Sequence, residues 1–595
     1  MSSEAAPLRS ASRVAPEDRV AIGISFGNSN SSIAYTFDDR VEVIANEDGD
    51  RQIPTVLSYV DGEEYYGQQA KNFLVRNPKN TVAYFKDLLG RDFASIDPTY
   101  CHASAHPQET NGEVTFTIID KAGELVGGDS DETKPADPST VSVHDIATRY
   151  LKRLVGSASD YLGRKVTSAV ISVPSNFSDA QRQAIIKAAD AADLEILQLI
   201  SDPASIAAAY TARIDAEANS SDAAGADQKK DKVVLVLDIG GTRSDATVLA
   251  SSAGMATVLA AVHDYEFVGA ALDKVLIDHF AKEFAKKNKG VDPRENARSL
   301  AKLRLEAEST KKALSLGTNA SFSVESLADG IDFTSTINRV RYETLARPVF
   351  EGINRLVSEV VKKADLDLLD VDVVVLSGGS AHTPRIAVNM SMLFGEHASV
   401  VAPSTVPSAT NPSELQARGA ALQANLVRDF DAEEIEQSAH SAVSTVQHTS
   451  LAVGVIATPL NAADGETEVF TPIIVAESAV PVRRAILLAG PKEGGDVLLK
   501  FAEGSTHVHT VAPPKKEAKA EADEDDKDDS DFDSDEEEEE ERKRGWKVQG
   551  LLAEAALRGV KAGAKIEVAI SIRADFAVSF TAREVGGKAA VRGSF

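Results

Sequence analysis

Two hydrophobic patterns alternate along the first 428 residues. Short apolar runs such as "VTSAVISVP" at 166–174 predict buried strands. Segments such as "DAQRQAIIKAADAA" at 179–192 have the apolar spacing of an amphipathic helix. Strands that alternate with helices are typical of α/β proteins, so residues 20–428 are expected to form one α/β domain.

The pattern changes after Arg428. The charged stretch "DFDAEEIEQSAHSAV" predicts a linker over 429–446 with at most one helical turn. Six short β-like runs then follow between turn residues, and they predict a small antiparallel β-sandwich over 447–595. A highly charged segment at 512–544 should interrupt it as a disordered insertion, and residues 1–19 are expected to form a disordered tail.

Charge and composition narrow the class of protein. The 595-residue chain is too long for a single core, and its net charge is −28. Residues 521–541 alone hold 16 acidic residues and one lysine. Such a chain is not expected to bind nucleic acid through its net field. Cys101 is the only cysteine, which excludes an internal disulfide and a thiolate metal cluster. Without a signal-like or membrane-spanning apolar run, a cytoplasmic location is expected.

An internal repeat carries the first chemical signal. "IGISFGNSNSSIAY" near the N-terminus recurs in outline as "VLDIGGTRSDATVL" from Val236, so that Ser25 and Gly27 align with Asp238 and Gly240. Glycine in such turns lets backbone N–H groups surround an anion. One glycine-rich turn is equally compatible with a plain β-hairpin. Two of them, together with the later "LSGGS", indicate a two-lobed actin-like ATPase with one phosphate-binding turn in each lobe.

Longer stretches resemble the 70-kDa heat-shock chaperone family over nearly all of 21–426. They include "NPKNTVAYFKDLLGRDF", "ISVPSNFSDAQRQA", "LISDPASIAAAY", "VLDIGGTRSDATV" and "VVVLSGGSAHTPRI". The C-terminal run "FTPIIVAESAVPVRR" is similar to the peptide-binding β-sandwich of that family. The resemblance therefore implies an actin-like nucleotide-binding domain followed by a small sandwich.

The resemblance also implies an ATP site with a magnesium ion. Lys86 matches the family's catalytic lysine, which orients the attacking water, and Asp238 matches a carboxylate that holds Mg²⁺ through water. Asp202 matches a second catalytic carboxylate. The remaining nucleotide contacts implied by the match are Gly27, Asn28, Ser29, Gly240, Gly241, Thr242, Arg243, Glu308, Lys311, Lys312, Ser315, Gly378, Gly379, Ser380 and His382.

Several of these positions depart from the family pattern. Ser25 replaces the first-lobe carboxylate, Asp202 replaces a glutamate, and Arg243 replaces a threonine. Phosphoryl transfer depends on a positioned water, metal and compensating charge, so hydrolysis should be slow or absent. Arg243 either contacts phosphates or pairs with an acid such as Asp245. Lys86 could also be an ordinary surface lysine, and His382 a plain loop histidine.

The second half departs from the family as well. The 429–446 segment lacks the family's leucine-rich linker, and no helical lid follows the sandwich. This combination resembles the atypical fungal family members of the ribosome-associated complex. The resemblance implies a stable zuotin-type J-protein partner, ribosome contact through that partner, weak contact with nascent chains, and stimulation of a second, active heat-shock chaperone. The rival interpretations are an active ATP-hydrolysing chaperone that binds peptides itself and a small-molecule kinase.

Two questions stay open at the level of the sequence. The partner interface is expected on the linker and the sandwich, where an exposed sheet edge could accept a partner strand. Ser530 and Ser534 have acidic residues three positions later, a pattern that acidophilic kinases accept, although such a charged run is most often only a solvated spacer.

Overall fold

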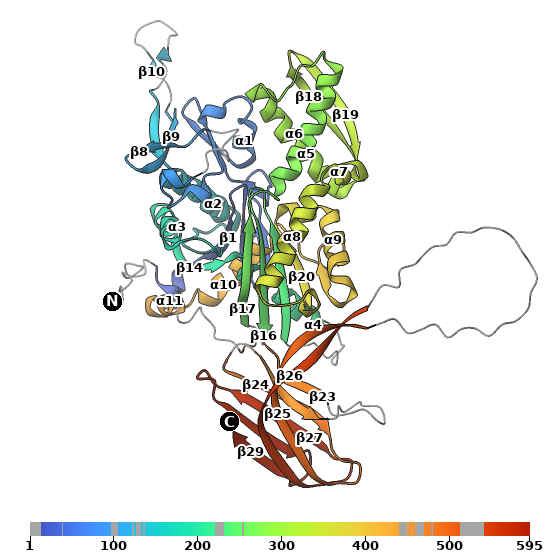
Figure 1. Ribbon diagram of the computed structural model, residues 1–595. Helices are drawn as coiled ribbons and strands as arrows, with labels where there is room; N and C mark the ends of the chain where they lie inside the picture. The colour runs from blue at the N-terminus through green and yellow to red at the C-terminus, as the bar shows by residue number, and fades with distance from the viewer. Residues whose placement is uncertain are drawn as a thin grey trace, which may run out of the picture. The chain divides into compact units, whose positions relative to one another are not determined.

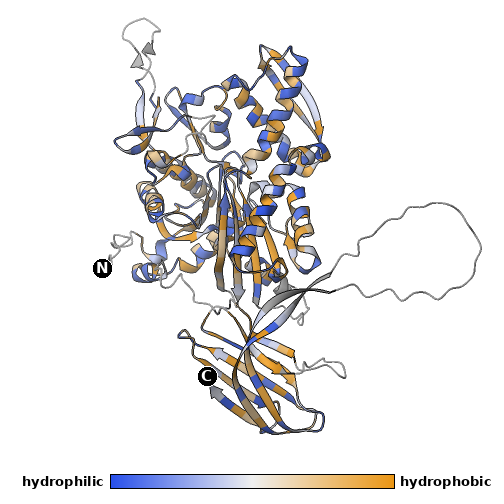
Figure 2. Cartoon of the chain, in the orientation of Figure 1, coloured by the Kyte–Doolittle hydropathy of each residue, from blue (hydrophilic) through white to orange (hydrophobic). Residues whose placement is uncertain are grey.

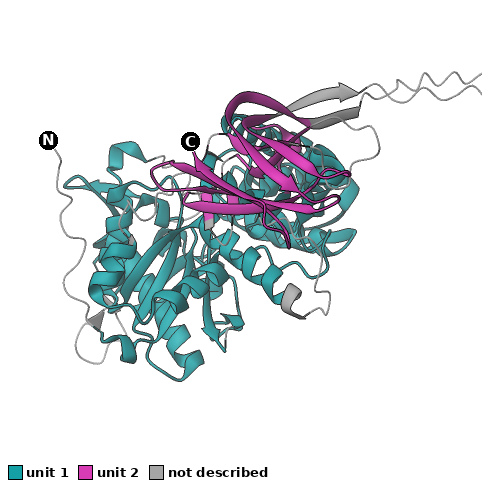
Figure 3. Cartoon of the chain, turned by 90° about the horizontal axis from the view of Figure 1, so that it is seen from below, with its two compact units in different colours: residues 1–249, 258–365, 373–445 teal, residues 250–257, 366–372, 446–595 magenta. Residues whose placement is uncertain are grey.

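The computed structural model contains two compact units (Figure 3), which Figure 1 labels by element. Unit 1 comprises residues 1–249, 258–365 and 373–445, and unit 2 comprises residues 250–257, 366–372 and 446–595. The expected α/β fold with a C-terminal antiparallel sandwich is confirmed. The structure describes residues 14–38, 40–96, 105–121, 124–125, 133–134, 137–220, 231–252, 255–439, 449, 451–457, 469–476, 478, 480–511 and 541–595.

The first half of unit 1 is built on a sheet with the strand order β14-β13-β1-β2-β3. Its central strand, β1, pairs in parallel with β13 and antiparallel with β2. The apolar side chains of Ile22 and Ile24 in β1 are completely buried, as expected for a strand covered on both faces. The strands are β1 (Ala21–Phe26), β2 (Asn30–Phe37), β3 (Arg40–Ile44), β13 (Ser168–Val173) and β14 (Glu195–Ser201).

The second half repeats this plan with the strand order β17-β16-β15-β20-β21. Ser25 is the last but one residue of β1 and faces Ser172 in the register, and Asp238 has the same place in β15, opposite Ser377. The predicted repeat is therefore a structural one. The strands are β15 (Asp231–Ile239), β16 (Ser244–Ser252), β17 (Met255–Asp264), β20 (Val373–Ser377) and β21 (Ser399–Val401).

Helix α10 (Leu415–Val427) packs closely against β1 and α4 (Asp202–Ser220). Glycine makes this possible at both contacts, because Gly23 lies on β1 and Gly419 on α10 itself. A Cβ on Gly23 would lie 2.1 Å from the Ala421 nitrogen, and one on Gly419 would lie 1.8 Å from the Ser205 carbonyl oxygen. Neither position accepts a side chain. This packing fixes the first turn of α10 beside the ends of the two central strands.

Further helices and small sheets complete unit 1 (Figure 1). The helices are α1 (Gly67–Asn72), α2 (Val143–Leu162), α3 (Asp179–Ala191), α5 (Gly269–Lys287), α6 (Ala297–Leu316), α7 (Arg339–Leu345), α8 (Arg347–Lys363) and α9 (Pro384–Phe394). The smaller strands are β4 (Ile53–Pro54), β5 (Val56–Val60), β6 (Glu63–Tyr66), β7 (Thr81–Ala83), β8 (Gln108–Thr110), β9 (Glu113–Ile118), β10 (Glu124–Leu125), β11 (Thr133–Lys134), β12 (Ser139–Ser142), β18 (Asn319–Ala328) and β19 (Ile331–Asn338). No helix in the described ranges is both long and apolar enough to cross a lipid bilayer.

The sandwich in unit 2 consists of two four-stranded antiparallel sheets, ordered β23-β22-β25-β26 and β24-β27-β28-β29. Apolar side chains such as Val455, Phe501 and Val568 form its core, and the strands alternate in hydropathy (Figure 2). The strands are β22 (Ala452–Ala457), β23 (Val469–Ile474), β24 (Val482–Ala489), β25 (Gly495–Val511), β26 (Glu541–Val560), β27 (Lys565–Ile572), β28 (Val578–Glu584) and β29 (Ala590–Ser594).

The expected insertion and tail are corrected at their edges. Residues 541–544 start β26, because their backbone pairs with β25, so the insertion does not reach 544. Residues 512–540, including Ser530 and Ser534, and also Cys101, lie outside the described residues.

The disordered tail does not extend to 19, because Pro16–Asp18 form a 3-10 turn and Arg19 is buried. Its Nη1 donates to the Arg428 carbonyl oxygen at 2.9 Å.

The segment after α10 contains more helix than the single turn expected for the linker. Helix α11 spans Ala432–Ala439, and Ile435 within it is buried. Ile435 belongs to an apolar cluster with Val170, Leu197 and Val427. One apolar residue in a charged segment therefore attaches this helix to the first sheet.

Candidate nucleotide site

The two predicted phosphate-binding turns contact each other. Asn28 in the first turn donates from Nδ2 to the Thr242 hydroxyl in the second at 3.2 Å. A Cβ on Gly241 would lie 2.4 Å from the Ser29 hydroxyl, so the second turn needs glycine there for the two turns to approach this closely. The structure thus brings together the glycine-rich turns that are far apart in the sequence.

Gln416, a residue that the sequence analysis missed, bridges the two repeat positions. The Ser25 hydroxyl donates to the Gln416 amide oxygen at 2.6 Å, and the Gln416 amide nitrogen donates to Asp238 Oδ2 at 2.6 Å. Ser25 and Asp238 are 6% and 8% exposed. A neutral amide therefore links the two central strands. The available signal was a polar residue in the first turn of a helix that otherwise packs through alanine and glycine.

Asp238 is a weaker acid than usual, and burial is the main cause. Burial, and after it the nearby Asp202 and Asp245, raise the pKa of this carboxyl, Arg243 partly offsets them, and the resulting pKa is about 7. Burial also raises the pKa of Asp202. Two buried carboxylates beside Asp245 need positive charge nearby, and Arg243 supplies such a charge from the protein itself.

The guanidinium of Arg243 forms ion pairs with acidic residues beside the second glycine turn. Its Nε is 2.7 Å from Asp245 Oδ2, and its Nη2 is 3.7 Å from Asp202 Oδ2. Of the two orientations that the sequence left open, the structure has the one paired with Asp245. The expected catalytic carboxylate Asp202 is thus already next to a guanidinium.

Lys86 is buried, so it is not an ordinary surface lysine. It is 4% exposed, and its Nζ lies 3.3 Å from Asp87 Oδ1 and 4.7 Å from the centre of the Phe177 ring. The backbone N–H of Asp87 donates to the Asn28 side chain at 3.4 Å. This ammonium group is therefore held beside the first phosphate-binding turn.

The predicted adenosine contacts on α6 form ion pairs. Glu308 pairs with Lys71 at 2.6 Å and with Lys312 at 2.8 Å, and Lys311 pairs with Asp273 at 2.8 Å. Burial opposes ionisation of Glu308, but the two lysines outweigh it and lower the pKa of this carboxyl to about 2. The hydroxyl of Ser315 donates to its own helix at the Lys311 carbonyl, so the structure does not aim it at a ligand.

The glycines at the end of β20 touch the phosphate region. Gly378 has a φ of +85°, and a Cβ there would lie 2.6 Å from Asp238 Oδ1. The Ser380 hydroxyl donates to the Gly240 carbonyl oxygen at 3.2 Å. Gly379 is more open, since its Cβ would meet only the Ser413 hydroxyl, at 3.9 Å.

His382 is a hydrogen-bonded residue of a 3-10 turn at Gly379–His382. Its Nε2 lies 3.0 Å from Asn411 Oδ1 and 3.1 Å from the Ser413 hydroxyl. Burial lowers its pKa, which keeps the ring neutral near pH 7. His382 is thus a neutral, hydrogen-bonded residue, and its contact with a base stays a prediction from the sequence resemblance.

These residues fit the phosphates of a nucleotide. The two glycine turns contact each other, Lys86 and Arg243 both act on Asp202, and a Cβ at Gly241 or Gly378 would clash. Magnesium has less support, because the described residues contain no group of three or more His, Cys, Asp or Glu side chains suited to a metal. Mg²⁺ often needs only one carboxylate besides phosphates and water, and Asp238 is the residue that would provide it.

Comparison with known proteins shows which family this chain is similar to. The family model described as Hsp70 protein matches residues 21–449. The heat shock protein 70 homolog of Schizosaccharomyces pombe is 40% identical over 583 residues, covering 97% of this chain and 96% of that protein. The ribosome-associated complex subunit SSZ1 of Saccharomyces cerevisiae is 39% identical over 575 residues, covering 96% of this chain and 99% of that protein.

More distant relatives match a smaller share of this chain. The heat shock 70 kDa protein of Emericella nidulans is 32% identical over 473 residues, covering 78% of this chain and 65% of that protein. The family model, the two full-length relatives and the two phosphate-binding turns agree with the resemblance seen in the sequence. The chain belongs to the Hsp70 family.

Proposed function

We propose that this chain is a ribosome-associated chaperone subunit that binds ATP and hydrolyses it slowly or not at all. The observation that carries the proposal is the bridge from Ser25 through Gln416 to Asp238, together with the pairing of Arg243 with Asp202. The first carboxylate is replaced by a hydroxyl, and the other two already have hydrogen-bonding or ionic partners. Binding groups for phosphates remain, but the groups that position metal and water are occupied by the protein.

The magnitude of the loss supports a holding role. Removing one group that stabilises the transition state typically slows a reaction by about two to three decades. The loss at Ser25 and the constraint on Asp238 and Asp202 act on the same step, so turnover should fall below the time scale of a chaperone cycle. Nucleotide would then be a structural ligand that stabilises the folded unit by mass action.

The proposed partners are supported by the similarity to the yeast subunit, whose name places that protein in a ribosome-associated complex. The similarity extends over nearly the full length of both chains, which supports the same assignment here. In this proposal a zuotin-type J-protein is a stable partner, carries the chain to the ribosome in the cytoplasm, and with it stimulates a second, active chaperone of the family on nascent chains. The net charge of −28 makes such a tether necessary, because rRNA repels an acidic chain.

One experiment separates holding from hydrolysis. ATP affinity of the purified full chain is measured by calorimetry with and without Mg²⁺, followed by single-turnover hydrolysis with and without a J-protein. Binding in the micromolar range or tighter with no J-protein-stimulated turnover supports the proposal. Turnover within minutes, stimulated by the J-protein, overturns it.

The second candidate is an active ATP-hydrolysing chaperone. It is favoured by Lys86, which is buried beside the first phosphate-binding turn and attracts the nearby Asp202. If these two residues suffice to position water, nucleotide-dependent release of a bound peptide should accompany turnover in the same assay. Peptide release that does not change with nucleotide excludes this candidate.

A further inference from the structure

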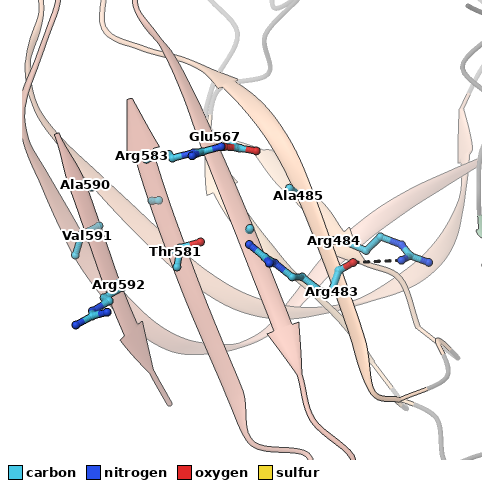
Figure 4. A pocket seen from close by; sticks show the side chains of 11 residues that line it. Arg483, Arg484, Ala485, Glu567, Thr581, Arg583, Ala590, Val591 and Arg592 are labelled. Carbon is cyan, nitrogen blue, oxygen red and sulfur yellow. Dashed lines mark hydrogen bonds and ion pairs between the residues drawn. The ribbon is translucent and has the colours of Figure 1, made fainter. Parts of the chain in front are cut away.

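The exposed face of the β24-β27-β28-β29 sheet contains an open depression of about 790 Å³ (Figure 4). A second depression of about 590 Å³ shares Arg483, Ala569, Thr581 and Arg592 with it, so the two are one continuous surface. Its floor consists of short side chains that stand opposite each other across the strands. In the register, Ala485 faces Ala569, and Ser571 faces Ser579. An extended chain could therefore lie close to the sheet.

Arginines stand around this floor. Arg583 is paired with Glu567, and Figure 4 shows their side chains pointing toward each other. Arg483 extends over the sheet in the direction of Thr581. Within the part of the chain that the structure describes, neither Arg483 nor Arg592 has a carboxylate within ion-pair distance. Two uncompensated guanidinium groups thus occur on a chain whose net charge is −28.

The spacing of these two arginines suits an extended acidic peptide. Arg483 lies on β24 and Arg592 on β29, three strand spacings away, which is roughly 15 Å. Acidic residues four positions apart project from the same side of an extended chain, and their backbones are about 13 Å apart. Long side chains can cover the remaining distance to the two arginines. Guanidinium groups bind carboxylates in bidentate fashion, and the hydroxyls of Ser571 and Thr581 add donors to the floor.

Nucleic acid fits this surface less well. Single-stranded nucleic acid is bound by aromatic side chains on which bases stack, and the only aromatic residue lining the surface is Phe580. Phe580 is 6% exposed and packs on Phe501 in the core, so it offers no stacking platform. The net charge of the chain also opposes a long polyanion more than a short peptide with a few carboxylates.

We propose that this face, named here the arginine face and defined by Arg483, Arg592, Thr581 and the floor between them, binds an acidic segment of a partner protein in extended form. It is a site separate from the nucleotide site and does not depend on ATP. It lies on the β24-β27-β28-β29 sheet and not on the other sheet of the sandwich.

The test measures binding of a labelled peptide to the full chain by fluorescence anisotropy at low salt. The probe is a twelve-residue peptide with Glu at every fourth position among Ser and Thr, and its control has Gln at the same positions. Arg483→Gln/Arg592→Gln should weaken binding of the acidic probe about tenfold, since exposed pairs contribute modestly each. The matched control, Lys547→Gln/Arg558→Gln, removes the same charge from exposed positions on β26 of the other sheet and should leave affinity within twofold.

Each remaining outcome decides against the proposal. Equal loss in both double variants means a nonspecific charge effect, and equal affinity for the Glu and Gln peptides means that carboxylates are not recognised. Tighter binding of a twelve-nucleotide oligouridylate, lost in the arginine variant, identifies RNA as the ligand instead. If the peptide binds only after deletion of 512–540, the chain's own acidic segment is the occupant rather than a partner. Unchanged melting temperatures verify that all variants are folded.

Discussion

The amide nitrogen of Gln416 lies 2.6 Å from Asp238 Oδ2, and this hydrogen bond joins the first turn of α10 to the end of β15. The same amide group accepts from Ser25 on β1. This neutral bridge therefore joins the ends of the two strands without a cation.

Hydrolysis should increase only when both Ser25 and the bridging Gln416 are changed. Ser25→Asp alone places a carboxylate against the Gln416 amide, which remains bonded to Asp238, so turnover stays low. In Ser25→Asp/Gln416→Val the two carboxylates face each other without the amide, and they need a cation between them. We expect single-turnover hydrolysis with Mg²⁺ to rise about tenfold.

Ser25→Asn/Gln416→Val is the matched control for this prediction, because it has the same shape without the new charge. Its hydrolysis rate should equal that of the unchanged chain. If Ser25→Asp/Gln416→Val is no faster than this control, the bridge does not limit the reaction.

Arg243 compensates the buried Asp202 and the partly exposed Asp245, so its charge should matter for stability. Arg243→Gln leaves Asp202 and Asp245 close together without a counter-charge, and we expect a loss of about 3 kcal/mol in the free energy of unfolding of unit 1. Arg243→Lys keeps the charge and should lose less than half as much. Nucleotide-free protein is compared by urea unfolding at pH 7. Similar stability in the Gln variant and the unchanged chain would show that the guanidinium contributes no net energy.

Gly241 should control the affinity for ATP through space alone. A Cβ in Gly241→Ala would lie 2.4 Å from the Ser29 hydroxyl and 3.0 Å from its Cβ, so one phosphate-binding turn must move. Calorimetry should give an ATP affinity at least tenfold weaker. Gly156→Ala on α2 is the control, because a Cβ there meets nothing within 4 Å. An unchanged affinity in Gly241→Ala would exclude this turn from the nucleotide site.

Sequence patterns predicted the strands and turns of the site better than its connections. The two phosphate-binding turns were found because glycine and small polar residues recur at a fixed place after an apolar strand. Gln416 was missed because no local pattern distinguishes a buried bridging amide from a surface glutamine, and its role depends on the packing of α10 onto β1. The orientation of Arg243 stayed undecided for the same reason, since the sequence alone does not show whether its guanidinium contacts phosphates or pairs with Asp245.

Glu308 should make the stability of unit 1 sensitive to acid. Its pKa is about 2 in the folded chain, below the usual value of 4.5, because Lys71 and Lys312 outweigh the effect of burial. A lowered pKa stabilises the folded state above the unfolded value, and this contribution is lost as the pH falls from about 4.5 towards 2. Glu308→Gln should therefore cost about 2 kcal/mol at pH 7 and progressively less below pH 4.5.

The control for this pH dependence is Glu359→Gln, which changes an exposed acid on α8. Its effect on unfolding should be small and independent of pH. If Glu308→Gln shows the same cost at pH 3.5 as at pH 7, the ion pairs with the two lysines are not the source of its stabilisation.

Ile435 should decide whether α11 stays attached to the first sheet. It is 3% exposed within a charged helix and packs with Val170, Leu197 and Val427. Ile435→Ala removes most of this contact, and a buried truncation of this kind costs about 2 to 4 kcal/mol. An eight-residue helix is too short to persist alone, so the loss should appear as local opening rather than global unfolding. Hydrogen exchange of the backbone amides in 432–439 should accelerate at least tenfold, while exchange in β13 changes little.

Ile435→Val keeps most of the apolar contact and should retain protection. Unchanged exchange in the alanine variant would mean that the segment is held by its polar contacts, such as the hydrogen bond from Gln198 Nε2 to the Ser438 carbonyl oxygen, and not by this single apolar side chain.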